Sequence, residues 1–120
     1  MDEKQDKHMS AARWKHLQRK LRELGFARYA DYLQSPHWRV VKVTWQPRRR
    51  SSKGQPVCEF CASAGLLELH HRTYRNLGNE RRSDLVLLCR DCHETVHIVH
   101  AKSKSRSLIR ATLAVQRAVS

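Results

Sequence analysis

Four cysteines form two pairs, each with a two-residue spacer, and this pattern is typical of zinc binding. Cys58 and Cys61 make the first pair, Cys89 and Cys92 make the second, and 27 residues separate the pairs. A two-residue spacer lets both thiolates reach one ion, and two such pairs supply the four ligands of a structural, tetrahedral zinc site. The alternative is two disulfides, which are expected in secreted proteins. We therefore predict a structural Zn²⁺ on all four cysteines.

Four histidines indicate a second metal site beside the cysteines. His70 and His71 are adjacent, and His93 and His97 are four residues apart. Residues at this spacing share one face of a helix, so His93 and His97 can chelate a single ion, with a third ligand from His70 or His71. Strand alternation sends the adjacent pair to opposite faces, so a site using both requires the chain to leave the strand ladder near His71. Three imidazoles leave coordination positions open, as in catalytic zinc sites.

The other four histidines lack this arrangement. His100 lies on the helical face of His93 but about 10 Å along the axis, which predicts a residue at the surface or behind the ligands. His8, His16 and His37 have no partner at ligand spacing. We interpret these three as ordinary surface or core residues.

Apolar residues at helical spacing predict helices on both sides of these motifs. A first helix of about 14 residues is expected between Ser10 as N-cap and Gly25 as terminator. Its apolar side is formed by Trp14, Leu17, Leu21 and Leu24. A second helix is expected over residues 27–34, and a third begins at Ser35-Pro36. The apolar residues of that third helix are Trp38, Val41 and Trp45. Ser107 is expected to cap a final helix.

Two short apolar runs, residues 66–69 and 85–88, predict the strands of a hairpin. The loop between them, Arg72 to Asp84, is 13 residues long, and loops of this length are usually functional. A further helix is expected after Cys92. Residues 47–56 begin and end with proline and contain no apolar residue, so we predict a basic loop there.

The size and charge of the chain indicate one small domain that binds a polyanion. It has 120 residues and a formal net charge of +13, and a core this small commonly needs a metal or another crosslink. Residues 1–57 carry 14 Lys/Arg against 5 Asp/Glu, and residues 101–120 carry 5 against none. Residues 58–100 are nearly neutral. Two basic ends predict nucleic acid as the partner, with an anionic membrane surface as the minor alternative.

The hydropathy of the chain predicts no membrane span. The longest apolar run, residues 85–89, is far shorter than the roughly 18 residues that a transmembrane helix requires. The first residues contain acids and no apolar segment, unlike a secretory signal. We therefore expect a cytoplasmic protein.

The order and spacing of the motifs resemble the HNH nuclease family. Besides the first cysteine pair, the resemblance is carried by Leu69-His70-His71-Arg72-Thr73-Tyr74, Gly78-Asn79-Glu80 and Asp84-Leu85-Val86-Leu87-Leu88-Cys89-x2-Cys92-His93-x3-His97. It covers about 40 of the 120 residues, and residues 29–38 are more loosely similar to small bacterial and phage members. The resemblance implies an α+β fold, a zinc-stabilised, treble-clef-like ββα-metal finger with N-terminal helices and a C-terminal helix. It also implies a bacterial cell or phage-infected host as the setting.

The resemblance implies a role for each matched residue. His71 is the general base that takes a proton from water. The ligands of one divalent ion are His70, His93 and His97. Asp84 stands where the family has an asparagine that braces the loop carrying the base. An aspartate accepts a hydrogen bond but lacks the amide donor, which we expect from Asn79.

Hydrolysis of DNA phosphodiester bonds, by nicking or by double-strand cleavage, is the activity that the resemblance implies. Arg72 and Arg75 flank the base and are expected to hold the phosphate. The DNA-binding residues of the basic loop are Arg48, Arg49, Arg50 and Lys53. RNA is the alternative substrate. The catalytic ion is one of Zn²⁺, Ni²⁺, Mn²⁺, Co²⁺ or Mg²⁺, and imidazole ligands favour the first four.

We expect four segments: a basic helical region (1–46), a basic linker loop (47–57), the HNH domain (58–100) and a basic C-terminal helix or tail (101–120). Two other functions fit the same composition. One is a catalytically silent zinc finger that binds DNA as a regulator, which has no need of His71. The other is a protein-interaction module whose basic ends contact an acidic partner.

Overall fold

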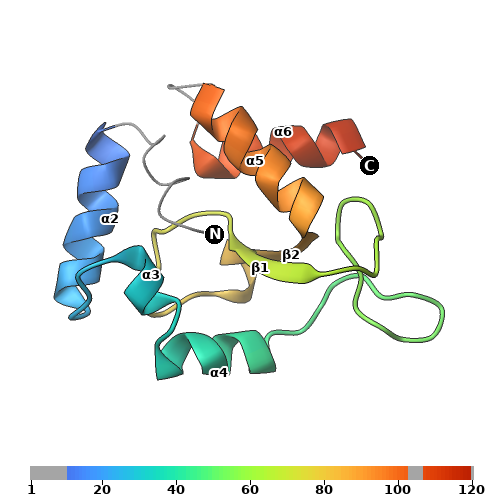
Figure 1. The fold of residues 1–120 in the computed structure, drawn as a ribbon, viewed down its shortest axis with the longest axis horizontal. Coiled ribbons are helices and arrows are strands. Elements are labelled where there is room, and N and C mark those ends of the chain that lie inside the picture. The colour runs from blue at the N-terminus through green and yellow to red at the C-terminus, as the bar shows by residue number, and fades with distance from the viewer. Residues whose placement is uncertain (1–10, 103–106, 120) are drawn as a thin grey trace.

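The computed structural model describes residues 11–102 and 107–119. Along the chain the elements are α2 (Ala11–Glu23), α3 (Tyr29–Tyr32), α4 (Pro36–Thr44), β1 (Leu67–His71), a 3₁₀ turn (Arg82–Asp84), β2 (Leu85–Cys89), α5 (Arg90–Lys102) and α6 (Leu108–Val119). The two strands form a hairpin that lies between α4 on one side and α5 on the other (Figure 1). A two-stranded antiparallel sheet with separate helices confirms the predicted α+β class.

The first helix forms as its apolar spacing predicts. Leu17 and Leu21 are fully buried on the inner side of α2. Gly25 follows the helix with φ +88°, the left-handed conformation that commonly ends a helix. Leu24 lies beyond the last helical residue and is 40% exposed. The predicted N-cap, Ser10, lies outside the described residues.

The predicted second helix is reduced to the single turn α3. Arg28 before it is extended, with φ −138° and ψ 156°. Ser35 is also extended, as required of a residue that precedes proline. Its hydroxyl accepts the N–H of Trp38 at 3.2 Å, which confirms the predicted N-cap of α4. Trp45, expected inside this helix, follows it in an extended conformation.

The hairpin confirms the two predicted strands and includes both adjacent histidines. His70 pairs with Val86 and His71 pairs with Leu85 in an antiparallel register. The first strand begins one residue later than predicted, and Leu66 is exposed. Because partners in register share a face and neighbours alternate, His70 and Val86 face α5, whereas His71 and Leu85 face the opposite side.

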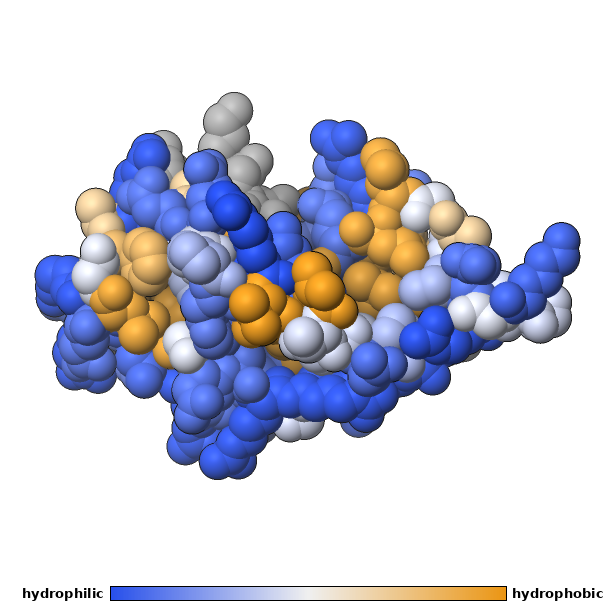
Figure 2. Space-filling model, turned by 90° about the horizontal axis from the view of Figure 1, so that it is seen from below, coloured by the Kyte–Doolittle hydropathy of each residue, from blue (hydrophilic) through white to orange (hydrophobic). Residues whose placement is uncertain are grey.

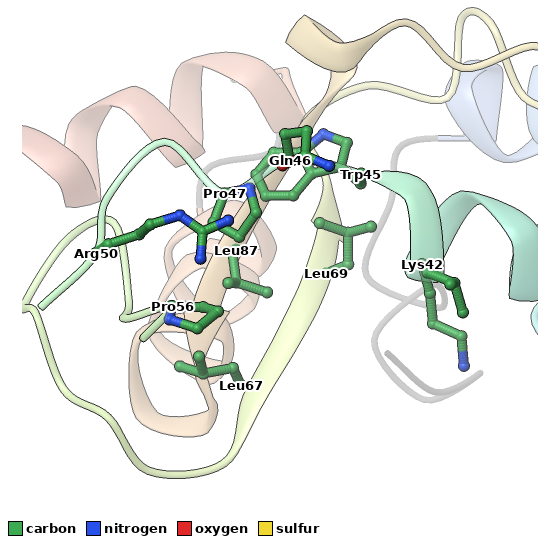
Figure 3. A pocket seen from close by; sticks show the side chains of 10 residues that line it. Lys42, Trp45, Gln46, Pro47, Arg50, Pro56, Leu67, Leu69 and Leu87 are labelled. Carbon is green, nitrogen blue, oxygen red and sulfur yellow. The ribbon is translucent and has the colours of Figure 1, made fainter. Parts of the chain in front are cut away.

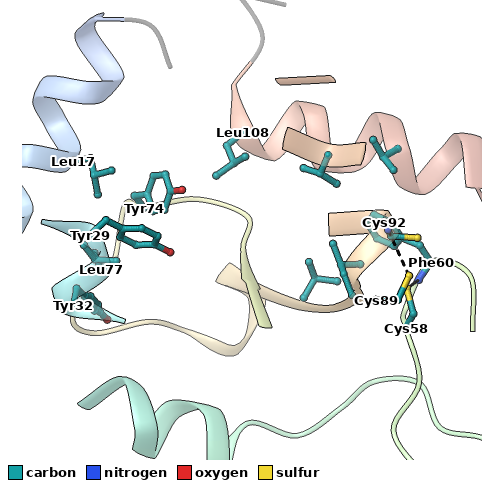
Figure 4. Close-up of a cluster of buried hydrophobic side chains, with 14 of the residues drawn as sticks. Leu17, Tyr29, Tyr32, Cys58, Phe60, Tyr74, Leu77, Cys89, Cys92 and Leu108 are labelled. Carbon is teal, nitrogen blue, oxygen red and sulfur yellow. Dashed lines mark hydrogen bonds between the residues drawn. The ribbon is translucent and has the colours of Figure 1, made fainter. Parts of the chain in front are cut away.

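One hydrophobic core joins the N-terminal helices to the cysteines (Figure 4). Its buried members include Tyr29, Tyr32, Tyr74 and Leu77 at one end and Cys58, Phe60, Cys89 and Cys92 at the other. Tyr74 and Leu77 belong to the long loop between the strands, so packing fixes that loop. The core therefore holds the loop and the cysteine pairs in one rigid arrangement.

The helices after the hairpin carry the remaining motifs. α5 begins at Arg90, three residues before the predicted start at His93, so Cys92, His93 and His97 lie in one helix. α6 begins where predicted, because the hydroxyl of Ser107 accepts the N–H of Arg110 at 3.2 Å. His100 is buried rather than at the surface.

Hydrophilic side chains cover most of the face seen from below, and hydrophobic side chains appear there as separate groups (Figure 2). Val40 and Val43 of α4 are 60% and 83% exposed. Among the described residues, no helix combines the length and apolar character that crossing a bilayer requires.

Candidate metal centres

The four cysteine sulfurs lie together at one end of the core. All four Sγ atoms fall within 4.8 Å of one another, and those of Cys61 and Cys89 are 3.6 Å apart. A tetrahedral zinc site with Zn–S bonds of about 2.3 Å places its sulfurs about 3.8 Å apart, whereas a disulfide requires about 2.05 Å. The cysteines are free thiols. The predicted set of Cys58, Cys61, Cys89 and Cys92 therefore fits one zinc ion.

Backbone N–H groups favour the charged form of these thiols. The N–H of Phe60 points to the sulfur of Cys58 at 3.4 Å, and the N–H of Cys92 points to that of Cys89 at 3.5 Å. Burial raises the pKa of Cys58, but backbone donors, those of Cys61 and Cys89 ahead of Phe60, outweigh it and lower the value to about 7. Cys58 is therefore accessible as a thiolate near neutral pH, as metal binding requires, whereas burial raises the pKa of Cys89 and Cys92.

Three imidazoles meet between β1 and α5. His70 comes from the strand and His93 and His97 from the helix, and their ring centroids are 4.9–5.2 Å apart. All three are buried, and one ring nitrogen of each lies within 4.8 Å of the others. Nδ1 of His70 and Nε2 of His93 and His97 have no hydrogen-bond partner. Buried ring nitrogens without partners are costly, and a cation bound by all three would satisfy them.

Two of these rings are held from outside the cluster. Oε1 of Glu68 lies 3.5 Å from Nδ1 of His93. Oγ1 of Thr112, on α6, lies 3.1 Å from Nε2 of His70. Each contact uses the nitrogen opposite the unpartnered one. In metal sites such outer partners fix the orientation and tautomer of the ligand.

The three rings are neutral at pH 7. Burial, with smaller contributions from His93 and His97, lowers the pKa of His70 well below its usual value. Burial lowers the pKa of His93 to about 4, although Glu68 favours its charged form, and lowers that of His97 to about 3. A neutral imidazole keeps a lone pair on one nitrogen, and this is the form that binds metals.

His71 lies on the other face of the hairpin. β1 stays in the ladder through His71, so it and His70 point to opposite sides. The ring of His71 is fully buried and stacks on Trp38, with centroids 4.6 Å apart. The structure therefore brings the three expected ligands together but does not bring the expected base to them.

Both ring nitrogens of His71 are hydrogen-bonded. Nδ1 lies 2.7 Å from the hydroxyl of Tyr29, and Nε2 lies 2.8 Å from Oε2 of Glu80. Burial lowers the pKa of His71 despite the carboxylate, so the ring carries one proton at pH 7. A carboxylate only accepts, which places that proton on Nε2. Tyr29 therefore donates to Nδ1.

Glu80 is the centre of a buried network. It accepts hydrogen bonds from His71, from the hydroxyl of Tyr32 and, at 2.9 Å, from Nε2 of His37. Burial by itself raises the pKa of Glu80, but the three donors outweigh it and lower the pKa to about 2. The side chain is 1% exposed. This carboxylate links the hairpin loop to α3 and α4, and it gives His37 a partner that its spacing in the sequence does not indicate.

Asp84 closes the long loop. Its carboxylate accepts from Nδ2 of Asn76 at 3.0 Å and from the N–H of Arg81 at 2.8 Å. Its carbonyl accepts the N–H of Arg72 at 2.7 Å. The amide donor is therefore Asn76, and the expectation that Asn79 supplies it is wrong. Asn79 is exposed.

Two of the predicted DNA-binding arginines, although exposed, hydrogen-bond to main-chain carbonyls of other segments. The guanidinium of Arg48 donates to the carbonyls of Arg82 at 2.7 Å and Leu85 at 2.9 Å. Arg49 donates to the carbonyl of Glu59 at 3.2 Å. These bonds attach the basic loop to the cysteine region and to β2.

The remaining predicted contacts are available at the surface. Arg50, Lys53 and Arg75 are exposed, and Arg72 is half-buried. Arg50 donates to the carbonyl of Gly54 at 2.9 Å, within its own loop.

A pocket of about 440 Å³ lies on the side of the hairpin away from the histidine cluster (Figure 3). Leucines of both strands, two prolines of the basic loop and Trp45 supply its apolar lining, and its cations are Lys42 and Arg50. None of the metal-ligand candidates lines it. Arg50 is the one predicted site residue that it contains.

No family model, curated protein or solved structure matches this chain.

Long-range contacts bring in residues for which the spacing in the sequence predicts no role. Tyr29 and Thr112 each contact a histidine 42 positions away, and Glu80 contacts Tyr32 across 48 positions. Glu80 had a signal, because it belongs to one of the matched motifs, and Tyr29 and Tyr32 had a weaker one in the loosely similar segment 29–38. Thr112 and Asn76 had none.

Proposed function

We propose that this protein is a metal-dependent endonuclease of the HNH type that hydrolyses phosphodiester bonds in DNA. The cluster of three buried, unpartnered imidazole nitrogens on β1 and α5 supports this most directly. In this proposal the hairpin and α5 form a ββα-metal finger, with structural Zn²⁺ on the four cysteines. The net charge of +13 attracts the DNA backbone.

The catalytic ion would be held by His70, His93 and His97. When bound, a divalent ion supplies positive charge that stabilises the charge developing on the phosphate and the leaving oxygen. The three rings are already neutral and buried, so binding requires no deprotonation of the protein. Imidazole donors favour Zn²⁺, Ni²⁺, Co²⁺ or Mn²⁺ over Mg²⁺.

In the proposed reaction His71 takes a proton from water, and Nδ1 is the atom that receives it. Glu80 accepts the Nε2 proton and so keeps Nδ1 unprotonated. In the structure the hydroxyl of Tyr29 already donates a hydrogen bond to Nδ1, at 2.7 Å. Proton transfer therefore requires water to replace Tyr29 at this nitrogen, and it requires the loop after β1 to bring His71, which faces the other side of the hairpin, to the ion.

A second function is favoured by the burial of His71. A zinc-stabilised protein that binds DNA without cleaving it needs the cysteines and the positive charge but no accessible base. In that case His71 serves as a buried link between Tyr29 and Glu80, and the hairpin is fixed to the N-terminal helices through it.

Plasmid cleavage by substituted proteins separates the two functions. The purified protein is incubated with supercoiled plasmid and Mn²⁺, Ni²⁺ or Mg²⁺, and metal content is measured alongside. We expect His93→Ala to lose the second metal and cleavage together, because two imidazoles retain an ion poorly. We expect His71→Ala to keep the metal and to lower the cleavage rate by roughly 10²- to 10⁴-fold. His16→Ala, in α2, is the matched control.

Each outcome has a defined meaning. Full cleavage by His93→Ala would refute the histidine cluster as the catalytic metal site. DNA binding without cleavage in any metal would establish the second function. Labelled RNA in place of the plasmid measures the preference between the two nucleic acids.

A further inference from the structure

We infer that Thr112 is a positioning residue of the three-histidine metal site, so that α6 forms part of that site. The inference rests on the metal binding proposed above. Thr112 lies in the C-terminal helix, outside the hairpin and α5 that carry the three ligands. Its hydroxyl determines which nitrogen of His70 is free to bind the ion.

The direction of the hydrogen bonds follows from counting protons. The hydroxyl of Thr112 donates to the carbonyl of Leu108 at 2.8 Å, and the same oxygen lies 3.1 Å from Nε2 of His70. A hydroxyl has one proton to donate, and here it is donated to the carbonyl of Leu108. Toward His70 the oxygen can therefore only accept, so Nε2 carries the ring proton. Nδ1, the nitrogen without a partner, keeps its lone pair.

Burial makes this arrangement hard to replace. His70 is 0% and Thr112 is 1% exposed, so solvent cannot easily supply another acceptor to Nε2. A buried donor without a partner is unfavourable. Without the threonine oxygen, nothing holds the proton on Nε2. A proton on Nδ1 is then favoured, because there it faces the unpartnered nitrogens of His93 and His97, and it blocks the ligand position.

The position of α6 does not depend on this hydroxyl. Leu108, Ala111 and Val115 of the same helix are buried in the core or against α5. Replacing the hydroxyl by a methyl group therefore leaves the apolar contacts of the helix in place. The effect of the substitution can then be assigned to the lost hydrogen bond.

Glu68 provides an independent parallel. Its carboxylate lies 3.5 Å from Nδ1 of His93, which leaves Nε2 of that ring unpartnered. Two of the three ligands thus have an acceptor on the nitrogen that faces away from the cluster. Outer partners of this kind typically change metal affinity by 10- to 100-fold when removed.

Calorimetric titration with Ni²⁺ tests the inference, using protein whose cysteine site is loaded with zinc. We expect Thr112→Val, which keeps the shape and removes the hydroxyl, to weaken binding at the second site by roughly 10- to 100-fold. Thr112→Ser restores the oxygen and is expected to restore most of the affinity. Thr95→Val is the matched control, because the hydroxyl of Thr95 bonds a carbonyl four residues earlier, at 2.8 Å, on an exposed face of α5.

A second measurement reads the tautomer directly. Nitrogen NMR of the imidazoles in metal-free protein is expected to show His70 protonated on Nε2, and on Nδ1 in Thr112→Val. Equal Ni²⁺ affinities for wild type and Thr112→Val, with an unchanged tautomer, would overturn the inference while leaving the metal site intact. If the wild type bound no second ion, the metal-site proposal would fail and the inference with it. The tautomer measurement would then still show whether Thr112 fixes the ring.

Discussion

His70 and His71 are neighbours in the sequence but belong to different parts of the molecule. Because a strand sends successive side chains to opposite faces, His70 joins the metal-ligand cluster and His71 joins the buried network of Glu80. Each ring has one nitrogen fixed by an oxygen acceptor. The free nitrogen of His70 has no partner, whereas that of His71 is covered by Tyr29. The chemistry available to each ring follows from this difference.

At the residue scale, the network around Glu80 predicts a pH-dependent stability. The pKa of Glu80 is lowered to about 2 in the folded protein, from an ordinary value of 4.5. A lowered carboxyl pKa stabilises the fold above about pH 4.5, and that contribution is lost as the pH falls toward 2. We expect Glu80→Gln to reduce the free energy of unfolding by roughly 2–3 kcal/mol at pH 7, measured by urea unfolding.

The difference between wild type and Glu80→Gln is expected to narrow between pH 4.5 and 3. Protonation of His70, His93 and His97 affects both proteins equally, whereas Glu80 also raises the pKa of His71, so the difference reports the Glu80–His71 pair. Glu94→Gln, at a side chain 54% exposed, is the control and should change stability little. A constant difference across this pH range would show that Glu80 is not ionised in the fold.

At the scale of elements, apolar periodicity predicted the long helices and both strands but not the contacts between them. Leu17 and Leu21 repeat with the period of a helix, and the alternation around His70 has the period of a strand, so local sequence carries both signals. The helix over residues 27–34 is shorter than predicted at its start because Arg28, inside that range, is extended. Thr112 and Asn76 could not be predicted, because their partners are distant in sequence or lie in an irregular loop.

In the basic loop, too, the sequence does not reveal the long-range contacts, and Arg48 is the example. A run of three arginines predicts contact with a polyanion. The guanidinium of Arg48 instead donates hydrogen bonds to two carbonyls and lies 5.1 Å from the ring centroid of Trp45. We expect Arg48→Ala to destabilise the protein by roughly 1–3 kcal/mol, since two main-chain carbonyls, one of them on the buried Leu85, lose a charged donor. Arg50→Ala, in the same loop, should change stability by less than about 0.5 kcal/mol. Thermal and urea unfolding compare the two, and equal losses would contradict the assignment.

At the scale of the whole molecule, two properties combine: a small core that includes three of the four clustered cysteines, with Cys61 exposed beside them, and a charge of +13. The core reaches from the aromatic residues of α3 to the cysteine sulfurs, so a zinc ion there would crosslink segments that are distant in sequence. Such a crosslink would offset the mutual repulsion among the surface cations, which opposes compaction of a domain of this size.

The same charge predicts strongly salt-dependent binding to DNA of any sequence. Each cation that neutralises a phosphate releases condensed counterions, so the logarithm of the affinity falls linearly with the logarithm of the salt concentration.

Arg50 and Lys53 are exposed in the basic loop and are not needed for its attachment. We expect the double substitution Arg50→Ala, Lys53→Ala to lower the affinity for unrelated duplexes alike and to reduce the salt slope by roughly 1–2. Fluorescence anisotropy between 50 and 200 mM salt measures both quantities, with the stability of the variant checked by urea unfolding. A change in sequence preference at constant salt slope would instead mean that the loop contacts bases, because phosphate contacts carry no sequence information directly.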